Sequence, residues 1–130
     1  MYRATTNGVQ VTVEPQFLPE HSDPQSGRYV WAYKIEIRNV GERAVQLRNR
    51  HWCITDALGR TEEVRGPGVV GEEPILAPGG AFQYTSGCPL KTPSGIMVGT
   101  YEMELETGER FLVDIPAFSL DLPDTPATVN

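Results

Sequence analysis

Three short stretches contain residue types whose spacing could do chemistry. Residues 66–71 read Gly-Pro-Gly-Val-Val-Gly, a literal match to the G-x-G-x-x-G pattern that binds the pyrophosphate of dinucleotides. His51 and Cys53 are two residues apart, so on a strand they would share one face at a separation of about 7 Å. Arg50 and His51 precede Trp52. Basic and aromatic side chains in such a cluster can hold a phosphate group or an acidic partner segment.

The glycine stretch lacks the helix that dinucleotide binding requires. In that class of site the glycines join a strand to a helix whose N-terminus faces the pyrophosphate. Here two prolines and a Pro-Gly turn follow Gly71 within eight residues, and proline removes a backbone donor and clashes with the preceding turn. We therefore exclude a Rossmann-type site and expect a loop or a short edge strand. A small anion site made by loop amides stays open, with the candidate residues Arg65, Gly66, Gly68 and Gly71.

Metal ligands and nucleophiles are sparse. Besides His51 and Cys53 the chain has only His21 and Cys88 as further nitrogen or sulfur ligands, without a C-x-x-C or H-x-x-x-H pair. Neither Cys53 nor Ser86 lies in a nucleophile motif such as G-x-S-x-G. We therefore expect no metal, no cofactor and no catalytic residue.

The basic residues Arg48, Arg50 and His51 have two interpretations. All three could form a binding patch with Trp52, or the two arginines could pair with the glutamates at 62–63 on a neighbouring strand. We favour the structural pairing, because charges at a protein surface usually have no specific role.

The elements that position these residues are strands. Hydrophobic and polar residues alternate with a period of two in five segments, typical of strands with one buried face: 9–13, 29–37, 82–84, 101–105 and 111–115. Turn residues separate the segments, and Thr107-Gly108 is a hairpin signal. No segment has a helical apolar stripe. The sequence predicts an all-β chain, an antiparallel β-sandwich of about seven or eight short strands.

The stretch 44–56 breaks this alternation. Its hydrophobic residues Val45 and Leu47 have odd numbers, whereas Trp52 and Ile54 have even numbers. Since a strand cannot exchange its buried face without an extra residue, we predict a β-bulge near residues 49–51.

Size and charge limit the function classes. The 130 residues suit one domain, over 1–122, followed by a proline-rich tail at 123–130 that we expect to be flexible. A net charge of −6 argues against a protein that binds the negatively charged phosphate backbone of nucleic acids. The chain shows no apolar run of membrane-spanning length and no secretory signal. We expect a cytoplasmic protein with reduced thiols and no membrane insertion.

Two stretches together resemble the ApaG family: RNRHWCITDALG at 48–59 and VRGPGVVGEEPILAPGGAFQYTSGCPLKTPSGIMVGTYEM at 64–103. The resemblance spans 9–115 and implies a fibronectin type III-like or immunoglobulin-like sandwich. Members of the family, also called CorD, have no established enzyme activity and are associated with cobalt resistance and magnesium efflux. The same domain occurs in F-box proteins. The resemblance implies a protein–protein interaction module with an unidentified protein partner. We expect the protein itself to be a monomer or a homodimer.

The family motifs also indicate positions for that interaction. Carried over onto this chain, they are Arg50, His51, Trp52, Asp56, Ser86, Gly87, Thr92, Pro93 and Gly95. One rival hypothesis is weak binding of phosphate, pyrophosphate or a nucleotide polyphosphate at the glycine stretch. Another is a cobalt or magnesium sensor that uses His51, Cys53 or acidic residues.

Overall fold

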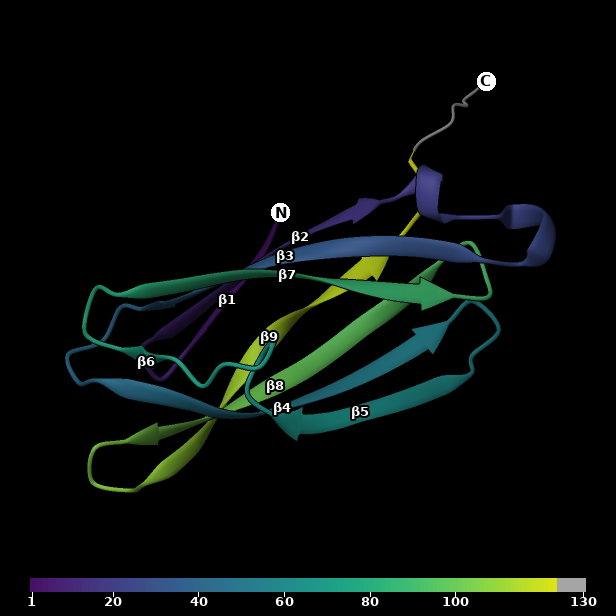
Figure 1. Cartoon of the computed structure of the whole chain (residues 1–130). Coiled ribbons are helices and arrows are strands. Elements are labelled where there is room, and N and C mark those ends of the chain that lie inside the picture. Colours follow the sequence, from purple (N-terminus) through teal and green to yellow (C-terminus); the bar gives the residue numbers. More distant parts are fainter. Residues whose placement is uncertain (124–130) are drawn as a thin grey trace.

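The alternating segments form nine strands in the computed structural model, which describes residues 1–123 (Figure 1). They are β1 (Tyr2–Thr6), β2 (Val9–Phe17), β3 (Tyr29–Asn39), β4 (Val45–Asp56), β5 (Thr61–Pro67), β6 (Ile75–Leu76), β7 (Ala81–Leu90), β8 (Gly95–Leu105) and β9 (Arg110–Leu120). Two 3-10 turns, η1 (Pro19–His21) and η2 (Pro24–Ser26), lie between β2 and β3. None of the helical segments in the described part of the chain is long and apolar enough to cross a membrane.

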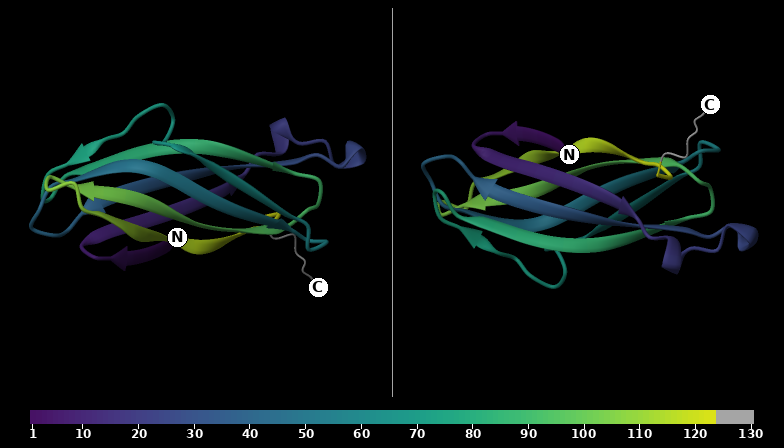
Figure 2. Two further views of the ribbon diagram at one scale, coloured as in Figure 1. Left: turned by 90° about the horizontal axis from the view of Figure 1, so that it is seen from below. Right: turned by 90° about the horizontal axis from the view of Figure 1, so that it is seen from above.

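The strands pack as two antiparallel sheets, which confirms the predicted β-sandwich of the fibronectin type III-like or immunoglobulin-like class. One sheet has the order β1-β2-β3-β7, and the other has the order β5-β4-β8-β9 with β6 paired to β4. Figure 2 shows the two layers from opposite sides. β1 and β2 contact β9, which closes the sandwich along one side. Along the other side lie β5 and β7, the outermost strands of the two sheets, and we call this side the open edge.

The core lies between the sheets and consists of the inward-facing residues of each strand. Val9, Val11 and Val13 of β2 are fully buried, as the alternation predicts. Each such side chain stabilises the fold by about 1.5–3 kcal/mol through removal of its surface from water. Trp52 of β4 packs edge-on against Phe118 of β9 in the same sheet, with ring centroids 5.9 Å apart. The sandwich therefore has an ordinary hydrophobic core and needs no disulfide, and both cysteines are free.

The strand count and the position of the bulge differ from the expectations. Residues 1–123 form nine strands rather than the seven or eight predicted, because β1 carries few strongly hydrophobic residues and β6 is only two residues long. The predicted β-bulge in β4 exists, but it lies at Arg48 rather than at 49–51. Leu47 pairs with Met103 and Asn49 pairs with Glu102, so Arg48 is the extra residue. A second register shift lies between Met97 and Gly99 in β8 and was not predicted.

The turns that the sequence predicts are present in the structure. The predicted hairpin at Thr107-Gly108 joins β8 to β9, and Gly108 has a φ of 90°. No helix follows Gly71, as the prolines predict; the chain instead forms β6 there. Apart from residue 123, the tail expected at 123–130 lies outside the described residues.

Candidate binding site at the open edge

A cavity of about 380 Å³ lies at the open edge, between the two sheets. The residues that line it come from five strands and from the loop after β5. They include Tyr33, Arg50, Trp52, Val64, Val69, Ser86 and Gly87. We call this space the edge cavity. It brings together four of the positions indicated by the family motifs, from segments more than thirty residues apart.

The bulge at Arg48 explains why an arginine faces the edge cavity. The extra residue shifts the alternation of β4, so that Arg50, Trp52 and Ile54 face the inside, as Val45 and Leu47 do before it. Trp52 is buried, and its ring packs edge-on against Tyr33 at 5.5 Å. Arg50 lies nearer the mouth of the cavity, next to the glycine stretch.

The guanidinium of Arg50 binds carbonyl groups of the glycine stretch. Its Nη1 donates to the carbonyl oxygens of Pro67 and Gly68, each at 2.9 Å. A Cβ added at Gly66 would lie 3.1 Å from the same guanidinium, so glycine allows this close packing without a shift of the arginine. Among the described residues Arg50 forms no ion pair with a carboxylate. The expected pairing of Arg50 with Glu62 or Glu63 is therefore wrong.

The turn that follows β5 is tight and strained. The amide of Val69 donates to the carbonyl of Glu72 at 2.8 Å, and the amide of Glu72 donates back at 2.9 Å. Between them Val70 and Gly71 have φ values of 44° and 81°, as in the type I′ turn of a two-residue hairpin. Gly71 suits this geometry, whereas valine is β-branched and strained there. The side chain of Val70 is 58% exposed and lies at the cavity.

The four residues predicted to bind an anion do not converge on one point. Gly66 packs against Arg50, and the amide of Gly68 donates to the carbonyl of Arg48 at 2.9 Å. Arg65 lies beside Glu63, with Nη2 3.2 Å from Oε1. Gly71 lies in the turn. Within the described residues, the amides of Val70 and Gly71 have no hydrogen-bond partner. Binding of an anion at this loop stays a prediction.

Three tyrosines form the inner wall of the core beside Arg50. The hydroxyls of Tyr84 and Tyr101 are hydrogen-bonded at 2.5 Å. Burial raises the pKa of both, and it raises the pKa of Tyr33 as well, against the smaller opposing effects of Ser86 and Arg50. All three hydroxyls are neutral at physiological pH, so they act as hydrogen-bonding groups.

Cys88 also lines the edge cavity but is a protonated thiol. Burial, with a smaller contribution from the negative charge of Glu62, raises the pKa of Cys88 to about 11. A thiol of this kind is a poor nucleophile at neutral pH, because the thiolate is the reactive species.

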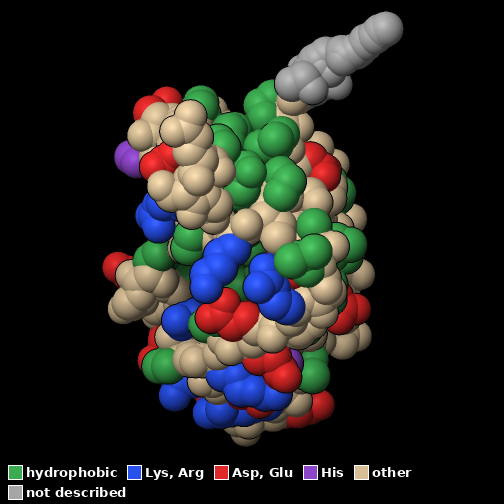
Figure 3. Space-filling model, turned by 90° about the vertical axis from the view of Figure 1, so that its right-hand side faces the viewer, with side chains coloured by type: hydrophobic (Ala, Val, Ile, Leu, Met, Phe, Trp, Pro, Cys, Tyr) green, Lys and Arg blue, Asp and Glu red, His purple; other side chains and the backbone are tan. Residues whose placement is uncertain are grey.

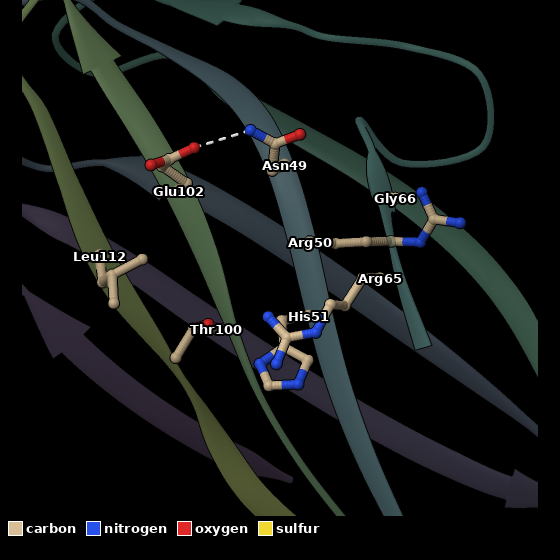
Figure 4. A pocket seen from close by; sticks show the side chains of 8 residues that line it. All are labelled: Asn49, Arg50, His51, Arg65, Gly66, Thr100, Glu102 and Leu112. Atoms are coloured by element: carbon tan, nitrogen blue, oxygen red, sulfur yellow. Dashed lines mark hydrogen bonds between the residues drawn. The ribbon is translucent and has the colours of Figure 1, made fainter. Parts of the chain in front are cut away.

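His51 faces away from the edge cavity, on the outer surface of the five-stranded sheet. Its Nε2 lies 2.8 Å from Oε1 of Glu63, so the residue that pairs with this glutamate from the basic cluster is the histidine and neither of the expected arginines, Arg48 and Arg50. The hydrogen bond with His51 and the charge of Arg65 lower the pKa of Glu63. Figure 4 shows the residues that line a pocket of about 340 Å³ on this surface, among them Arg65 and Gly66 as well as Asn49, which donates to Glu102 at 2.7 Å. The adjacent residues Arg50 and His51 therefore leave β4 on different faces, and Arg50 lines both this pocket and the edge cavity.

Arg48 pairs with acidic side chains from two other segments. Its Nη1 lies 3.2 Å from Glu73, and its Nε lies 3.1 Å from Glu104. Glu104 also contacts Arg110 at 3.4 Å. The expected partners of Arg48 at 62–63 are therefore wrong. Two glutamates of β8, Glu102 and Glu104, are therefore paired with arginines.

Four further motif positions lie at the end of the sandwich and hold its loops together. Asp56 accepts hydrogen bonds from the amides of Leu58 and Arg60 and from Nε of Arg60, at 2.8–3.0 Å. Thr92 is buried; its Oγ1 accepts from the amide of Ala57 at 3.0 Å and donates to the carbonyl of Ser94 at 2.8 Å. These bonds tie the β7–β8 loop to the β4–β5 turn.

Gly95 and Pro93 complete this end. A Cβ at Gly95 would lie 2.8 Å from the carbonyl oxygen of Thr55, so no larger residue fits. Pro93 is exposed between Thr92 and Ser94. These positions support the fold around the site rather than lining the edge cavity.

Charges are mixed on the end of the molecule that carries these loops. Figure 3 shows lysine and arginine side chains next to aspartate and glutamate side chains, without a continuous surface of one sign. Hydrophobic side chains gather near the point where the described chain ends.

Comparison with known proteins places this architecture in a family. A family model described as the ApaG domain matches residues 19–105, and Protein ApaG of Azorhizobium caulinodans is 59% identical over 130 residues, all of both chains. The chain belongs to the ApaG domain family. Protein ApaG of Rhodopseudomonas palustris is 58% identical over the same length.

Solved structures agree with this assignment to the ApaG family. The crystal structure of the ApaA protein of Bordetella pertussis has a TM-score of 0.88 and 48% identity, and it covers 96% of this chain and 100% of its own. The C-terminal domain of wzt has a TM-score of 0.51 at 11% identity, covering 98% of this chain and 88% of its own, which shows a shared fold alone.

Proposed function

We propose that this ApaG-domain protein is a non-enzymatic interaction module that binds another protein at its open edge. One observation carries the proposal: Arg50, Trp52, Ser86 and Gly87, distant in sequence, line the same edge cavity. The cavity has mainly apolar walls with an arginine at its mouth, which is the composition of a pocket that accepts an anchoring side chain.

The chemistry of the cavity supports binding rather than turnover. Its thiol is protonated and its tyrosines are neutral, and its arginine is held by two carbonyl groups. In the cell, we propose a cytoplasmic role connected with cobalt and magnesium homeostasis, exerted through the partner rather than through a metal site in this chain.

Site-specific photocrosslinking in cells tests the proposal. A benzophenone amino acid is placed at Thr85, on the open edge, or at Val40, an exposed residue between β3 and β4. We expect a discrete crosslinked protein from position 85 that is absent from position 40, and direct binding when that protein is purified. Equal crosslinking from both positions, or none from position 85, would contradict a specific surface at the open edge.

Binding of phosphate or pyrophosphate is the alternative function. The free amides of Val70 and Gly71 are the observation that favours it. Amide NMR spectra recorded during titration with pyrophosphate test it. Saturable shifts confined to residues 66–72 would support an anion site, whereas unchanged spectra at millimolar pyrophosphate would exclude one.

A further inference from the structure

Apart from the two-residue β6, which pairs only with β4 among the described residues, the two sheets have four outermost strands, and β7 differs from the other three. Natural proteins protect such strands from pairing with other chains by means of charged residues, prolines or bulges. β1 contains Arg3; β5 contains Glu62, Glu63, Arg65 and Pro67; β9 contains Arg110, Asp114 and Pro116. β7 reads AFQYTSGCPL, ten residues without a charge and with a proline only near its end.

The backbone of β7 is unpaired along its outer side. In antiparallel sheets, alternate residues direct their N–H and C=O groups toward the same neighbour. The amide of Asn39 donates to the carbonyl of Gly80, which directs the even-numbered residues of β7 toward β3. Gln83, Thr85 and Gly87 therefore point their backbone groups away from β3, and all three are exposed. Within residues 1–123, β3 is the only strand that pairs with β7.

Gly87 has no steric reason to be glycine within the chain itself. Its φ is not positive, and an added Cβ would meet only the carbonyl oxygen of Trp31, at an ordinary 3.6 Å. Glycine inside a strand often marks a place where another backbone approaches closely. At Gly87 the free direction is the outer side of β7.

The edge cavity lies directly beside this unpaired backbone. Tyr84, Ser86 and Cys88 of β7 face it, and Ile54 and Val64 form part of the opposite wall. A strand added next to β7 would lie about 4.8 Å from it, and every second side chain would point toward the space between the sheets.

From these observations we infer that β7 is an acceptor strand for an extended segment of the partner protein. The segment pairs with the backbone of Gln83, Thr85 and Gly87 and inserts a hydrophobic side chain into the edge cavity. Backbone hydrogen bonds supply affinity in this mode of recognition, and the pocket for alternate side chains supplies specificity. The inference rests on the proposed interaction function and names its mechanism.

A second copy of this chain fits the site less well. Two β7 strands paired about a two-fold axis would present Tyr84, Ser86 and Cys88 to each other's cavity. Tyr84 and Cys88 are already buried in their own core, at 9% and 4% exposure. The edge cavity would stay unfilled, so a heterologous segment is the occupant that we infer.

The test uses random decapeptides displayed on phage and selected on the full-length protein, followed by affinity measurements with the synthetic winners. Thr85→Pro removes one outward-facing amide of β7 and leaves the bonds to β3 intact, because proline is tolerated where the N–H faces solvent. Thr5→Pro is the matched control on the outermost strand of the other side, where Thr5 is also exposed. Val64→Phe fills the edge cavity without altering any backbone group.

We expect Thr85→Pro to raise the Kd of the selected peptides by about tenfold or more, since an edge hydrogen bond is lost and the strand approach is blocked. Val64→Phe should weaken binding likewise, and Thr5→Pro should leave it unchanged. In the wild-type protein, bound peptide should slow hydrogen exchange at the amides of Thr85 and Gly87. This last measurement decides the question if Thr85→Pro does not fold.

The possible outcomes distinguish a failure of strand addition at β7 from a failure of the proposed binding function of the open edge. One outcome is that Val64→Phe weakens peptide binding, Thr85→Pro does not, and bound peptide does not slow hydrogen exchange of the β7 amides. This outcome would support the open edge as a binding site and would overturn strand addition. Failure to select any peptide, or peptides indifferent to both variants, would overturn both. A wild-type dimer in sedimentation that Thr85→Pro converts to monomer would identify the occupant as a second copy and overturn the heterologous segment.

Discussion

At the scale of single residues, the G-x-G-x-x-G letters encode turn geometry and the packing of one arginine. Gly66 gives Arg50 room, Gly68 and Gly71 have positive φ values, and the carbonyls of Pro67 and Gly68 hold the guanidinium. Glycines of a nucleotide-binding turn direct amides toward a phosphate. Here two carbonyls of the stretch instead face a cation.

The two glycines of the turn should respond differently to alanine. A Cβ at Gly68 would lie 2.3 Å from the carbonyl oxygen of Glu72, whereas a Cβ at Gly71 meets nothing within 4 Å. We expect Gly68→Ala to lower the free energy of unfolding by about 3 kcal/mol or more, from backbone strain plus steric overlap. Gly71→Ala should lower the free energy of unfolding by only about 1 kcal/mol, because alanine is disfavoured at the positive φ of this position. Urea denaturation of both variants measures this, and equal losses would contradict the steric argument.

Substitution of Val70 should change the free energy of unfolding in the opposite direction, toward greater stability. Its φ of 44° is strained for a β-branched residue. Replacement by glycine or asparagine should raise the free energy of unfolding by about 1 kcal/mol, since both adopt this conformation more easily. Thermal and urea denaturation against wild type test this, with Val40→Asn as a control for loss of an exposed valine. A destabilised Val70→Gly protein would show that the valine side chain packs favourably enough to outweigh the strain.

At the scale of elements, the sequence predicts the strands well and the site only in part. Period-two alternation identifies strands such as β2 and β3, because each buries one face. The change of parity between Leu47 and Trp52 requires a bulge, but only pairing with β8 locates it at Arg48. The inward direction of Arg50 follows from that bulge. Its partners are backbone carbonyls, which leave no side-chain signature in the sequence.

The end of the sandwich depends on one hydroxyl that joins two loops. Thr92→Val keeps the shape of the buried side chain but removes both hydrogen bonds of Oγ1, to Ala57 and Ser94. We expect a loss of about 1–2 kcal/mol in the free energy of unfolding, because the part-buried amide of Ala57 loses its acceptor. Thr92→Ser keeps the hydroxyl and serves as the control. Similar losses for both variants would assign the role of Thr92 to its methyl group.

At the scale of the whole molecule, the sandwich is asymmetric. One side is closed by contacts of β1 and β2 with β9, and the other side leaves a cavity between β5 and β7. The positions indicated by the family motifs fall into groups that match this asymmetry. Those at the open edge line the cavity, those at the loop end hold the strands that frame it, and His51 lies on the outer surface of the five-stranded sheet.

Cys88 provides a probe of the open edge. Its pKa of about 11 lies well above the usual thiol value, so about one molecule in a thousand carries the thiolate at pH 8. We expect alkylation of Cys88 in the folded protein at pH 8 to be far slower than in urea. Mass spectrometry of a Cys53→Ser variant follows this thiol alone. Equal rates in the folded and the unfolded protein would contradict burial of Cys88.

The bulge at Arg48 also determines where β4 can change its length. Deleting one residue from a strand normally turns every following side chain to the opposite face. Deletion of Arg48 would instead leave Leu47 next to Asn49, restore regular pairing with Met103 and Glu102, and keep Trp52 in the core. We expect this deletion variant to fold, and the matched deletion of Cys53 to fail, as judged by folded yield and thermal denaturation. In evolution and in engineering, β4 can therefore shorten by one residue at this position without exchanging its inner and outer faces.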